Sequence, residues 1–399
     1  MAGNFVQLHN HTHYSLLDGA SKVPDLVKRV KELGMPAVGI TDHGNMHGAY
    51  ELWRAAVDSG VKPIIGIEAY VTPETARQDK TRVSWDTNWT PVPGHARNPD
   101  DVSGGGLITH LTMWAENDEG LVNLIKASSV ANLEGRVMRY PRMDKEVLST
   151  YSKGVIASSG CPSGIIQTRL RLGQFDEALR AAGEFQDIFG KDNFYIELMD
   201  HGLSIESKVT GDLLTIAKKL GAPLLATNDS HYVMEADKDA QDAMLCINSG
   251  ATLDDPNRFK FEGSGYYIKS AEEMRELFKD HPDACDNTLE IAERCNVIFD
   301  DHEDGAFMPQ FDCPEGWDET SLFLKKVEEG LEKRYDGNPP MEVLKQADYE
   351  CGVICQMQFC GYFLVVADYI NWAKEHGVMV GPGRGSAAGA MVAYAMGIT

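Results

Sequence analysis

Three histidines stand at alternate positions near the start of the sequence, as His9, His11 and His13, and Asp18 follows seven residues after His11. The largely apolar residues 5–8 precede them and are typical of a β-strand. Because alternate residues of a strand point to the same face, these imidazoles could project together. Neutral imidazole and carboxylate groups are common ligands of transition metals. The segment therefore predicts the nucleus of a metal site that later parts of the chain would complete.

Other metal-binding side chains follow or lie within further predicted strands. Short β-rich runs alternate with amphipathic helical patterns from residue 4 to about 300. The predicted strands are residues 5–9, 37–41, 63–71, 107–114, 154–159, 194–199 and 223–227. Barrels and other α/β folds place their active sites at the C-terminal ends of such strands. The candidate ligands at these ends or within the strands are His9, His11, Asp18, His43, Glu68, His110, Cys161, Asp229 and His231.

Each of these residues alone would be an ordinary core histidine, helix cap or solvated charge. Together they exceed the roughly four to six ligands of one metal, and they suffice for two or three metals that share carboxylates. Two metals about 3.5–4 Å apart can activate water and stabilise a phosphoryl transition state. Phosphoester hydrolysis is therefore the chemistry that we expect.

The elements that would position these ligands predict an α/β fold. Strands that alternate with helices indicate a mostly parallel sheet, and seven repeats with no central break favour a closed or distorted barrel. Residues 72–105, rich in proline and glycine, interrupt the pattern and predict a long surface loop. Residues 235–300 are expected to be helical, and further helices are expected at 319–335 and 340–359 after a polar break.

Composition limits the class of protein. The 399 residues suit two or three domains, and 43% hydrophobic with 24% charged residues is ordinary for a globular protein. We find no apolar run of about 20 residues and no signal peptide, and the eight cysteines lack disulfide-framework spacing. These features predict a cytoplasmic location. The net charge of −23 alone argues against nucleic-acid binding, but carboxylates that bind metals are neutralised.

The candidate ligands resemble the motifs of the PHP (polymerase and histidinol phosphatase) family. The matching segments are His9-Asn10-His11-Thr12, Thr41-Asp42-His43-Gly44, Glu68, His110, Cys161 and Asp229-Ser230-His231. The resemblance implies a distorted seven-stranded (β/α)7 barrel over residues 1–285 and a site for two or three divalent metals. It also implies how the ligands group: His9, His11 and Asp229 at one metal, His110 and Cys161 at a second that Glu68 bridges to the first, and Asp18, His43 and His231 at a third.

Cys161 is a soft ligand, so zinc is the expected metal, and the mixed nitrogen and oxygen set would also accept manganese or iron. His13 is not expected to be a ligand. His47, His95 and His201 lie outside the motifs and are expected at the surface.

A second informative segment is Gly381-Pro382-Gly383-Arg384-Gly385-Ser386. Glycines let the backbone approach phosphates and Arg adds a bidentate partner, although a plain strand–helix turn would use the same glycines. With residues 14–19, 226–232, 252–256 and 361–369, it resembles the bacterial family C replicative DNA polymerases. The resemblance implies that Arg384, Gly385 and Ser386 bind nucleotide, and that residues 286–399 are a linker and the partly helical start of a palm domain. We expect the magnesium-binding carboxylates of that palm to lie beyond this sequence.

These patterns lead to one principal hypothesis and two alternatives. The first is a replicative DNA polymerase that extends primers with dNTPs, in which the PHP domain is a metal-dependent 3′–5′ proofreading exonuclease. Its partners would be primer–template DNA, a sliding clamp and other replisome subunits, with no membrane. The alternatives are a PHP-family phosphomonoesterase and a non-catalytic, metal-stabilised scaffold for replisome partners. All nine ligand positions hold competent donors, which favours an active site.

Overall fold

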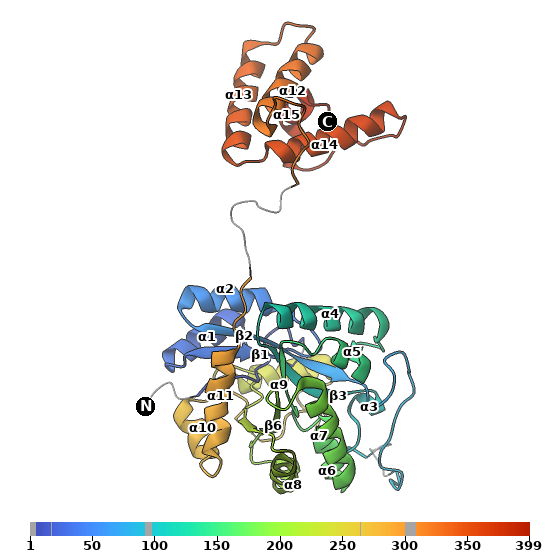
Figure 1. Ribbon diagram of the computed structural model, residues 1–399, viewed down its shortest axis with the longest axis vertical. Coiled ribbons are helices and arrows are strands. Elements are labelled where there is room, and N and C mark those ends of the chain that lie inside the picture. The colour runs from blue at the N-terminus through green and yellow to red at the C-terminus, as the bar shows by residue number, and fades with distance from the viewer. Residues whose placement is uncertain (1–4, 17, 92–97, 264, 300–308) are drawn as a thin grey trace. The chain divides into compact units, whose positions relative to one another are not determined.

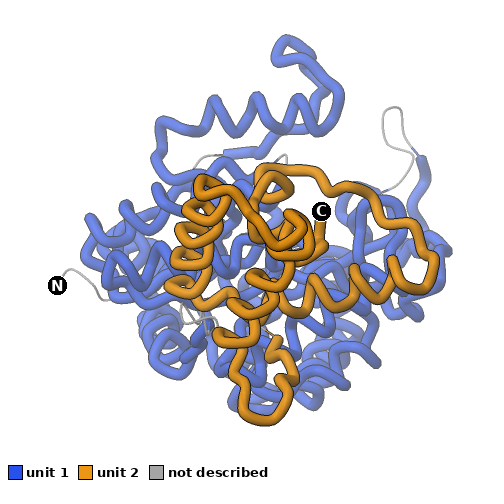
Figure 2. Tube along the Cα trace, turned by 90° about the horizontal axis from the view of Figure 1, so that it is seen from above, with its two compact units in different colours: residues 1–299 blue, residues 300–399 orange. Residues whose placement is uncertain are grey.

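The structure is a computed structural model that describes residues 5–16, 18–91, 98–263, 265–299 and 309–399. The chain divides into two compact units, residues 1–299 and 300–399, which Figure 2 marks in separate colours. The expected boundary after residue 285 falls inside helix α11 (Pro282–Arg294). The whole helix belongs to the first unit, because Arg294 donates a hydrogen bond to Glu116 at 2.9 Å and the Asn287 amide donates one to the Leu224 carbonyl at 2.7 Å. The first unit therefore extends beyond the expected boundary.

The first unit is built on a curled, seven-stranded sheet (Figure 1). Its strands are β1 (Ala37–Ile40), β2 (Lys62–Val71), β3 (Thr109–Ala115), β4 (Arg142–Met143), β5 (Val155–Ser158), β6 (Phe194–Leu198) and β7 (Leu224–Ala226). Their order is β1-β2-β3-β5-β6-β7, and the short β4, which the sequence did not predict, pairs with β2. Six of the seven expected strands are confirmed, with ends shifted by no more than two residues.

The remaining expected strand is the segment at residues 5–12, here called the closing segment. Its backbone bridges β1 on one side, where Gln7 pairs with Val38, and the end of β7 on the other, where Asn10 pairs with Ser230. The His11 N–H donates to the Ser230 carbonyl at 2.7 Å. The closing segment thus joins the first and last strands of the sheet. The fold is the expected distorted α/β barrel.

β3 runs antiparallel to both of its neighbours, β2 and β5, whereas β1–β2, β5–β6 and β6–β7 are parallel. The expectation of a mostly parallel sheet holds except at this strand. The segment at residues 72–108 causes this reversal of direction. It follows the last residue of β2, Val71, and brings the chain back beside that residue, so that Thr109 at the start of β3 pairs with Val71. His110 therefore lies near the start of its strand, yet at the same end of the barrel as the C-terminal ends of the parallel strands.

Amphipathic helices cover the outside of the sheet (Figure 1). The larger ones are α1 (Val23–Glu32), α2 (Ala49–Ser59), α4 (Asp118–Glu134), α7 (Phe175–Phe189), α8 (Ser204–Leu220) and α9 (Lys238–Ser249). The shorter ones are α3 (Ser103–Gly106), α5 (Lys145–Thr150), α6 (Ile165–Arg171) and α10 (Ala271–Leu277), with a 3-10 turn at Glu235–Asp237. In α1, a proline lies in the first turn, and the side chains at Val23, Leu26, Val27 and Val30 form one buried stripe.

The described part of the 72–105 segment is irregular apart from α3. A buried arginine of β4 anchors it to the barrel, and a buried aspartate of the segment itself binds other parts of the segment. The Arg142 guanidinium is fully buried and donates to the Arg77 and Asp79 carbonyls, each at 2.7 Å. The Asp101 carboxylate accepts hydrogen bonds from the Trp85 N–H and the Ser84 hydroxyl. These contacts satisfy backbone groups that a loop without regular pairing would leave unmatched.

The second unit is helical over its described residues. It contains α12 (Glu319–Arg334), α13 (Met341–Gln356), α14 (Cys360–Glu375), a 3-10 turn (Ser386–Gly389) and α15 (Met391–Ala395). The helices pack around a small core that includes Phe323, Leu331, Leu364 and Val392. Among the described residues no single helix is long and apolar enough to cross a membrane, and only the bent pair α13 and α14 passes that test together.

The first prediction concerns closure of the barrel. A Cβ at Gly39 would lie 2.7 Å from the Leu8 carbonyl oxygen and 3.0 Å from its Cα, both backbone atoms that cannot move aside. We expect Gly39→Ala to destabilise the first unit by about 1–3 kcal/mol, as overpacking does. Urea denaturation would measure it. The matched control is Gly211→Ala in α8, where the new Cβ meets no atom within 4 Å, and which should be neutral or slightly stabilising. Equal stability of the two variants would contradict the prediction.

Candidate metal centre

The closing segment supplies two ligand candidates to a buried centre at one end of the barrel. His9 and His11 are fully buried, and Nε2 of each faces the Asp229 carboxylate, at 3.3 Å and 3.0 Å respectively. Asp229 has a left-handed backbone (φ 44°), a conformation that aspartate and asparagine tolerate better than most residues. This turn after β7 directs the carboxylate back toward the two histidines.

A second group surrounds Glu68, which is 1% exposed in the middle of β2. Its Oε2 lies 2.6 Å from His43 Nδ1 and 3.1 Å from His110 Nδ1, and Oε1 lies 3.5 Å from His9 Nε2. Cys161 Sγ is 3.3 Å from His110 Nδ1. Glu68 and His110 share one face because Tyr70, two residues after Glu68, is paired with His110 across β2 and β3. One carboxylate therefore contacts groups on both sides of the centre, as a bridging ligand would.

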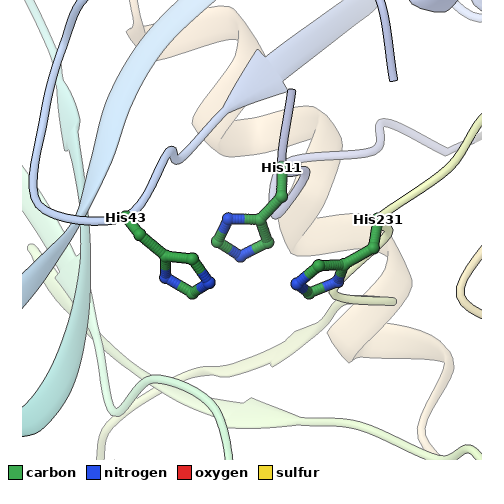
Figure 3. A group of neighbouring side chains, drawn as sticks. All are labelled: His11, His43 and His231. Atoms are coloured by element: carbon green, nitrogen blue, oxygen red, sulfur yellow. The ribbon is translucent and has the colours of Figure 1, made fainter. Parts of the chain in front are cut away.

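A third group contains Asp18, His43 and His231. His43 Nε2 is 3.2 Å from the Asp18 carboxylate, and the His11 ring centroid lies 4.0 Å from that of His43 and 4.3 Å from that of His231. Figure 3 shows the rings of His11, His43 and His231 side by side, each from a different segment of the chain. All nine residues singled out from the sequence thus meet at one end of the barrel.

The histidines are oriented by acceptors outside the centre. His9 Nδ1 donates to Glu197 at 2.7 Å, His11 Nδ1 donates to the Ser15 hydroxyl at 2.9 Å, and His231 Nδ1 donates to the Asp229 carbonyl at 2.8 Å. A proton on Nδ1 leaves Nε2 with a free lone pair, which is the form that binds a metal. The three rings are therefore fixed in a ligating tautomer.

Several buried polar atoms at the centre have no hydrogen-bond partner. They are His9 Nε2, His11 Nε2, His43 Nδ1, both carboxylate oxygens of Glu68, Asp18 Oδ1 and Asp229 Oδ1. Leaving such atoms unpaired costs roughly 1–3 kcal/mol each, and more where they are charged. Three overlapping sets are close enough to share an ion: His9, His11 and Asp229; His43, Glu68 and His110; and His11, His43 and His231. The residues present therefore fit a cluster of divalent metals, with nitrogen, oxygen and one sulfur donor.

The surroundings of the centre shift the pKa values of its ligand candidates in both directions. Although burial opposes it, neighbouring carboxylates raise the pKa values of His9 and His43 above the usual range, whereas those of His11 and Glu68 move toward the ligating forms. Burial, followed by the neighbouring His43 and His231, lowers the pKa of His11 to about 3. Burial opposes ionisation of Glu68, but His110 and His43 hold the pKa of this carboxyl well below its usual range. A neutral imidazole and an ionised carboxylate are the ligating forms of these groups.

Sequence reasoning missed two buried carboxylates behind the ligands. Glu197 lies within β6 and accepts hydrogen bonds from His9, from the Thr227 hydroxyl at 2.6 Å and from the Ser158 hydroxyl. Asp42 accepts a hydrogen bond from the Ser15 hydroxyl at 2.8 Å, so that two hydrogen bonds in series connect His11 through Ser15 to Asp42. The sequence does mark Glu197, because it is the one acidic residue in the otherwise apolar run Phe194–Leu198.

The prediction for His201 was wrong. Its side chain is 1% exposed, it contacts the Glu206 carboxylate at 2.7 Å and the Asn228 carbonyl at 2.9 Å, and it stacks on Tyr266 at 4.1 Å. His201 therefore supports the turn that carries Asp229 instead of facing solvent. His47 is exposed as expected, and His95 lies outside the described residues.

The predicted nucleotide-binding residues lie in the second unit. Arg384, Gly385 and Ser386 are exposed, and the left-handed backbone at Gly383 (φ 79°) and Gly385 (φ 102°) requires glycine. The 3-10 turn and α15 follow directly. The role of these three residues in nucleotide binding stays a prediction.

The second prediction tests the carboxylate behind His9. Glu197→Gln keeps the size of the side chain but removes the charge that orients the imidazole. We expect a 10- to 100-fold loss of metal affinity, which is about what removal of such outer partners costs. Metal titration followed by calorimetry would measure it. Glu276→Gln, at a side chain that is 76% exposed in α10, is the matched control and should bind metal like the parent chain. Unchanged affinity in Glu197→Gln would contradict the prediction.

Known protein families match both units. Residues 7–201 match the family described as PHP domain, and residues 321–399 match the family described as Bacterial DNA polymerase III alpha NTPase domain. The chain is thus similar to both families, to the first over the part of the barrel that contains β1 to β6 and to the second over most of the described second unit.

Individual relatives are similar along nearly the whole chain. A DNA polymerase III subunit alpha of Mycobacterium leprae is 51% identical over 99% of this chain and 33% of its own length. Those of Saccharopolyspora erythraea and Treponema pallidum are 50% and 41% identical, also over 99% of this chain, and over 33% and 32% of their own lengths. The chain thus spans about a third of the length of these relatives. A solved amidohydrolase from Chromobacterium violaceum is 14% identical over 57% of this chain and 87% of its own, with a TM-score of 0.33, too low to carry an argument.

Proposed function

We propose that this chain is part of a cytoplasmic replicative DNA polymerase that extends primers with dNTPs, and that its first unit is a metal-dependent 3′–5′ proofreading exonuclease. The observation that carries the exonuclease is the meeting of nine donor side chains, six of which have buried polar atoms without a hydrogen-bond partner. The relatives named DNA polymerase III subunit alpha support the polymerase assignment.

In this proposal the nine donors hold two or three divalent metals. His9, His11 and Asp229 would hold one, His110 and Cys161 would hold a second with Glu68 shared between these two, and Asp18, His43 and His231 would hold the third. The thiolate of Cys161 favours zinc over harder ions. When bound, the metals supply Lewis acidity for attack of water on the terminal phosphodiester. Glu197, Ser15 and the Asp229 carbonyl keep the three imidazoles in the ligating tautomer.

The second unit is proposed as a linker and the start of the palm domain. The exposed turn at Arg384, Gly385 and Ser386 would contact the triphosphate of a dNTP, whose transfer requires magnesium. Primer–template DNA, a sliding clamp and other replisome subunits are the proposed partners.

One preparation of the chain tests the exonuclease. Its metal content is measured, and it is then incubated with a 5′-labelled primer–template that carries a mismatched 3′ nucleotide, and separately with histidinol phosphate. We expect bound metal and stepwise release of 3′ nucleotides, without release of phosphate from histidinol phosphate. Phosphate release alone would favour the phosphomonoesterase. Bound metal with no activity on either substrate would favour the scaffold.

A further inference from the structure

A series of aromatic rings leads from the metal centre to the surface of the first unit. The Phe261 ring meets the ligand candidate His231 edge-on, with centroids 4.7 Å apart, and also contacts Tyr266 at 4.9 Å. Phe259 continues the series at 6.1 Å from Phe261. Phe259 is 60% exposed, although water disfavours so large an apolar side chain. The outermost ring therefore has a face that is free to stack.

The rings line the same cavity as the metal centre. This cavity measures about 360 Å³, and the ligand candidates Asp18, His43, His110, Cys161, Asp229 and His231 lie along it. Phe259, Phe261 and Tyr266 line it too, together with the aliphatic side chains of Leu203 and Ile205. A group that reaches the metal centre through this cavity passes between apolar surfaces. Free phosphate or a small phosphorylated alcohol would not use them.

One lysine at the cavity suits a phosphodiester. Lys260 lies between the two phenylalanines in the sequence, is exposed and lines the cavity. Four acidic side chains also line it: the ligand candidates Asp18 and Asp229, Glu206, which contacts His201 at 2.7 Å, and the exposed Glu262. Lys260 is thus placed to contact a backbone phosphate next to a stacked base.

We infer that Phe259 and Phe261 form a stacking surface for the nucleobase of the 3′-terminal nucleotide, with Lys260 on the adjacent phosphate. The inference rests on the proposed exonuclease and specifies its substrate. A base can stack on these rings only after it leaves the duplex, which costs least at a mismatched or single-stranded end. Base–aromatic stacking does not depend on sequence. The surface would therefore select unpaired 3′ ends of any sequence over paired ones.

Fluorescence of 2-aminopurine tests the stacking directly. The probe is a single-stranded oligonucleotide with 2-aminopurine as its 3′-terminal base and a terminal phosphorothioate linkage, which resists cleavage. We expect the intact chain to quench the terminal 2-aminopurine. Phe259→Leu, which keeps an apolar side chain but removes the ring, should raise Kd by about 5- to 150-fold, the range that stacking on one ring supports. Phe259→Trp should restore binding.

Two controls separate stacking from other effects. Leu253→Ala changes another exposed apolar side chain, 56% exposed, in the loop that follows α9, and should leave quenching unchanged. In excision assays, Phe259→Leu should raise KM for single-stranded DNA with little change in kcat. Equal quenching and equal KM in Phe259→Leu and the parent chain would overturn the inference while leaving the exonuclease intact. Absence of excision by the parent chain would refute the exonuclease, and the quenching would still decide whether the rings stack a base.

Discussion

Substitution of Asp229 by asparagine should remove nearly all exonuclease activity. This carboxylate lies 3.0 Å from His11 Nε2 and 3.3 Å from His9 Nε2, and its inward oxygen has no other partner. Loss of an outer partner alone typically costs 10- to 100-fold, so we expect more than about a 100-fold loss when a ligand itself loses its charge. Release of a mismatched 3′ nucleotide from a labelled primer would measure it.

The substitution is clean because asparagine accepts the left-handed backbone of position 229 about as readily as aspartate. A loss of activity would therefore report the missing charge and not a distorted turn. Asp58→Asn, at a side chain that is 60% exposed in α2, is the matched control and should excise like the parent chain. If Asp229→Asn excised the mismatch at the parent rate, the proposed nuclease site would be wrong.

Removal of metal should lower the melting temperature of the first unit and leave the second unchanged. The unpartnered atoms of His9, His11, Glu68 and Asp229 are compensated only when they bind an ion. One ion at about 100 times its Kd contributes roughly 2.7 kcal/mol, which corresponds to roughly 4 °C in a unit of 299 residues. Calorimetry before and after dialysis against a chelator would measure the shift.

The second unit serves as the internal control. All three groups of neighbouring ligand atoms among the described residues lie in the first unit, so only one of two transitions should move. Return of zinc should restore the first transition. If the chelator left the melting temperature of the first unit unchanged, the barrel would be stable without its metals. The alternative of a scaffold that metals stabilise would then be wrong.

The sequence was sufficient to predict the site because its signal is local. Alternating histidines after an apolar run, and single donors beside other such runs, required only the period of a strand. The barrel followed from the alternation of strands and helices. His9, Glu68 and Asp229 could therefore be named as candidate ligands before any distance was known, although their binding of metal stays a prediction.

Three features could not be predicted, two because they depend on tertiary contacts and one because its sequence pattern is ambiguous. The antiparallel direction of β3 is set by where the 72–108 segment returns to the sheet. Burial of His201 arises from Glu206 and Tyr266, and neither contact has a sequence signature. Helix α14 was not predicted, because its first residues, Gly361–Ala367, form a nearly continuous apolar run whose period does not distinguish helix from strand.

Closure of the barrel links residues that are far apart in order of synthesis. The Val6 N–H donates to the Thr288 hydroxyl at 3.1 Å, across a sequence separation of 282 residues, and the Gln7 amide donates to the Lys269 carbonyl at 3.0 Å. A ribosome that adds about 5–20 residues per second needs roughly 15–60 s to cover that separation. The contact between the closing segment and α11 can therefore form only late in synthesis, after all seven strands and all nine ligand candidates have been added to the chain.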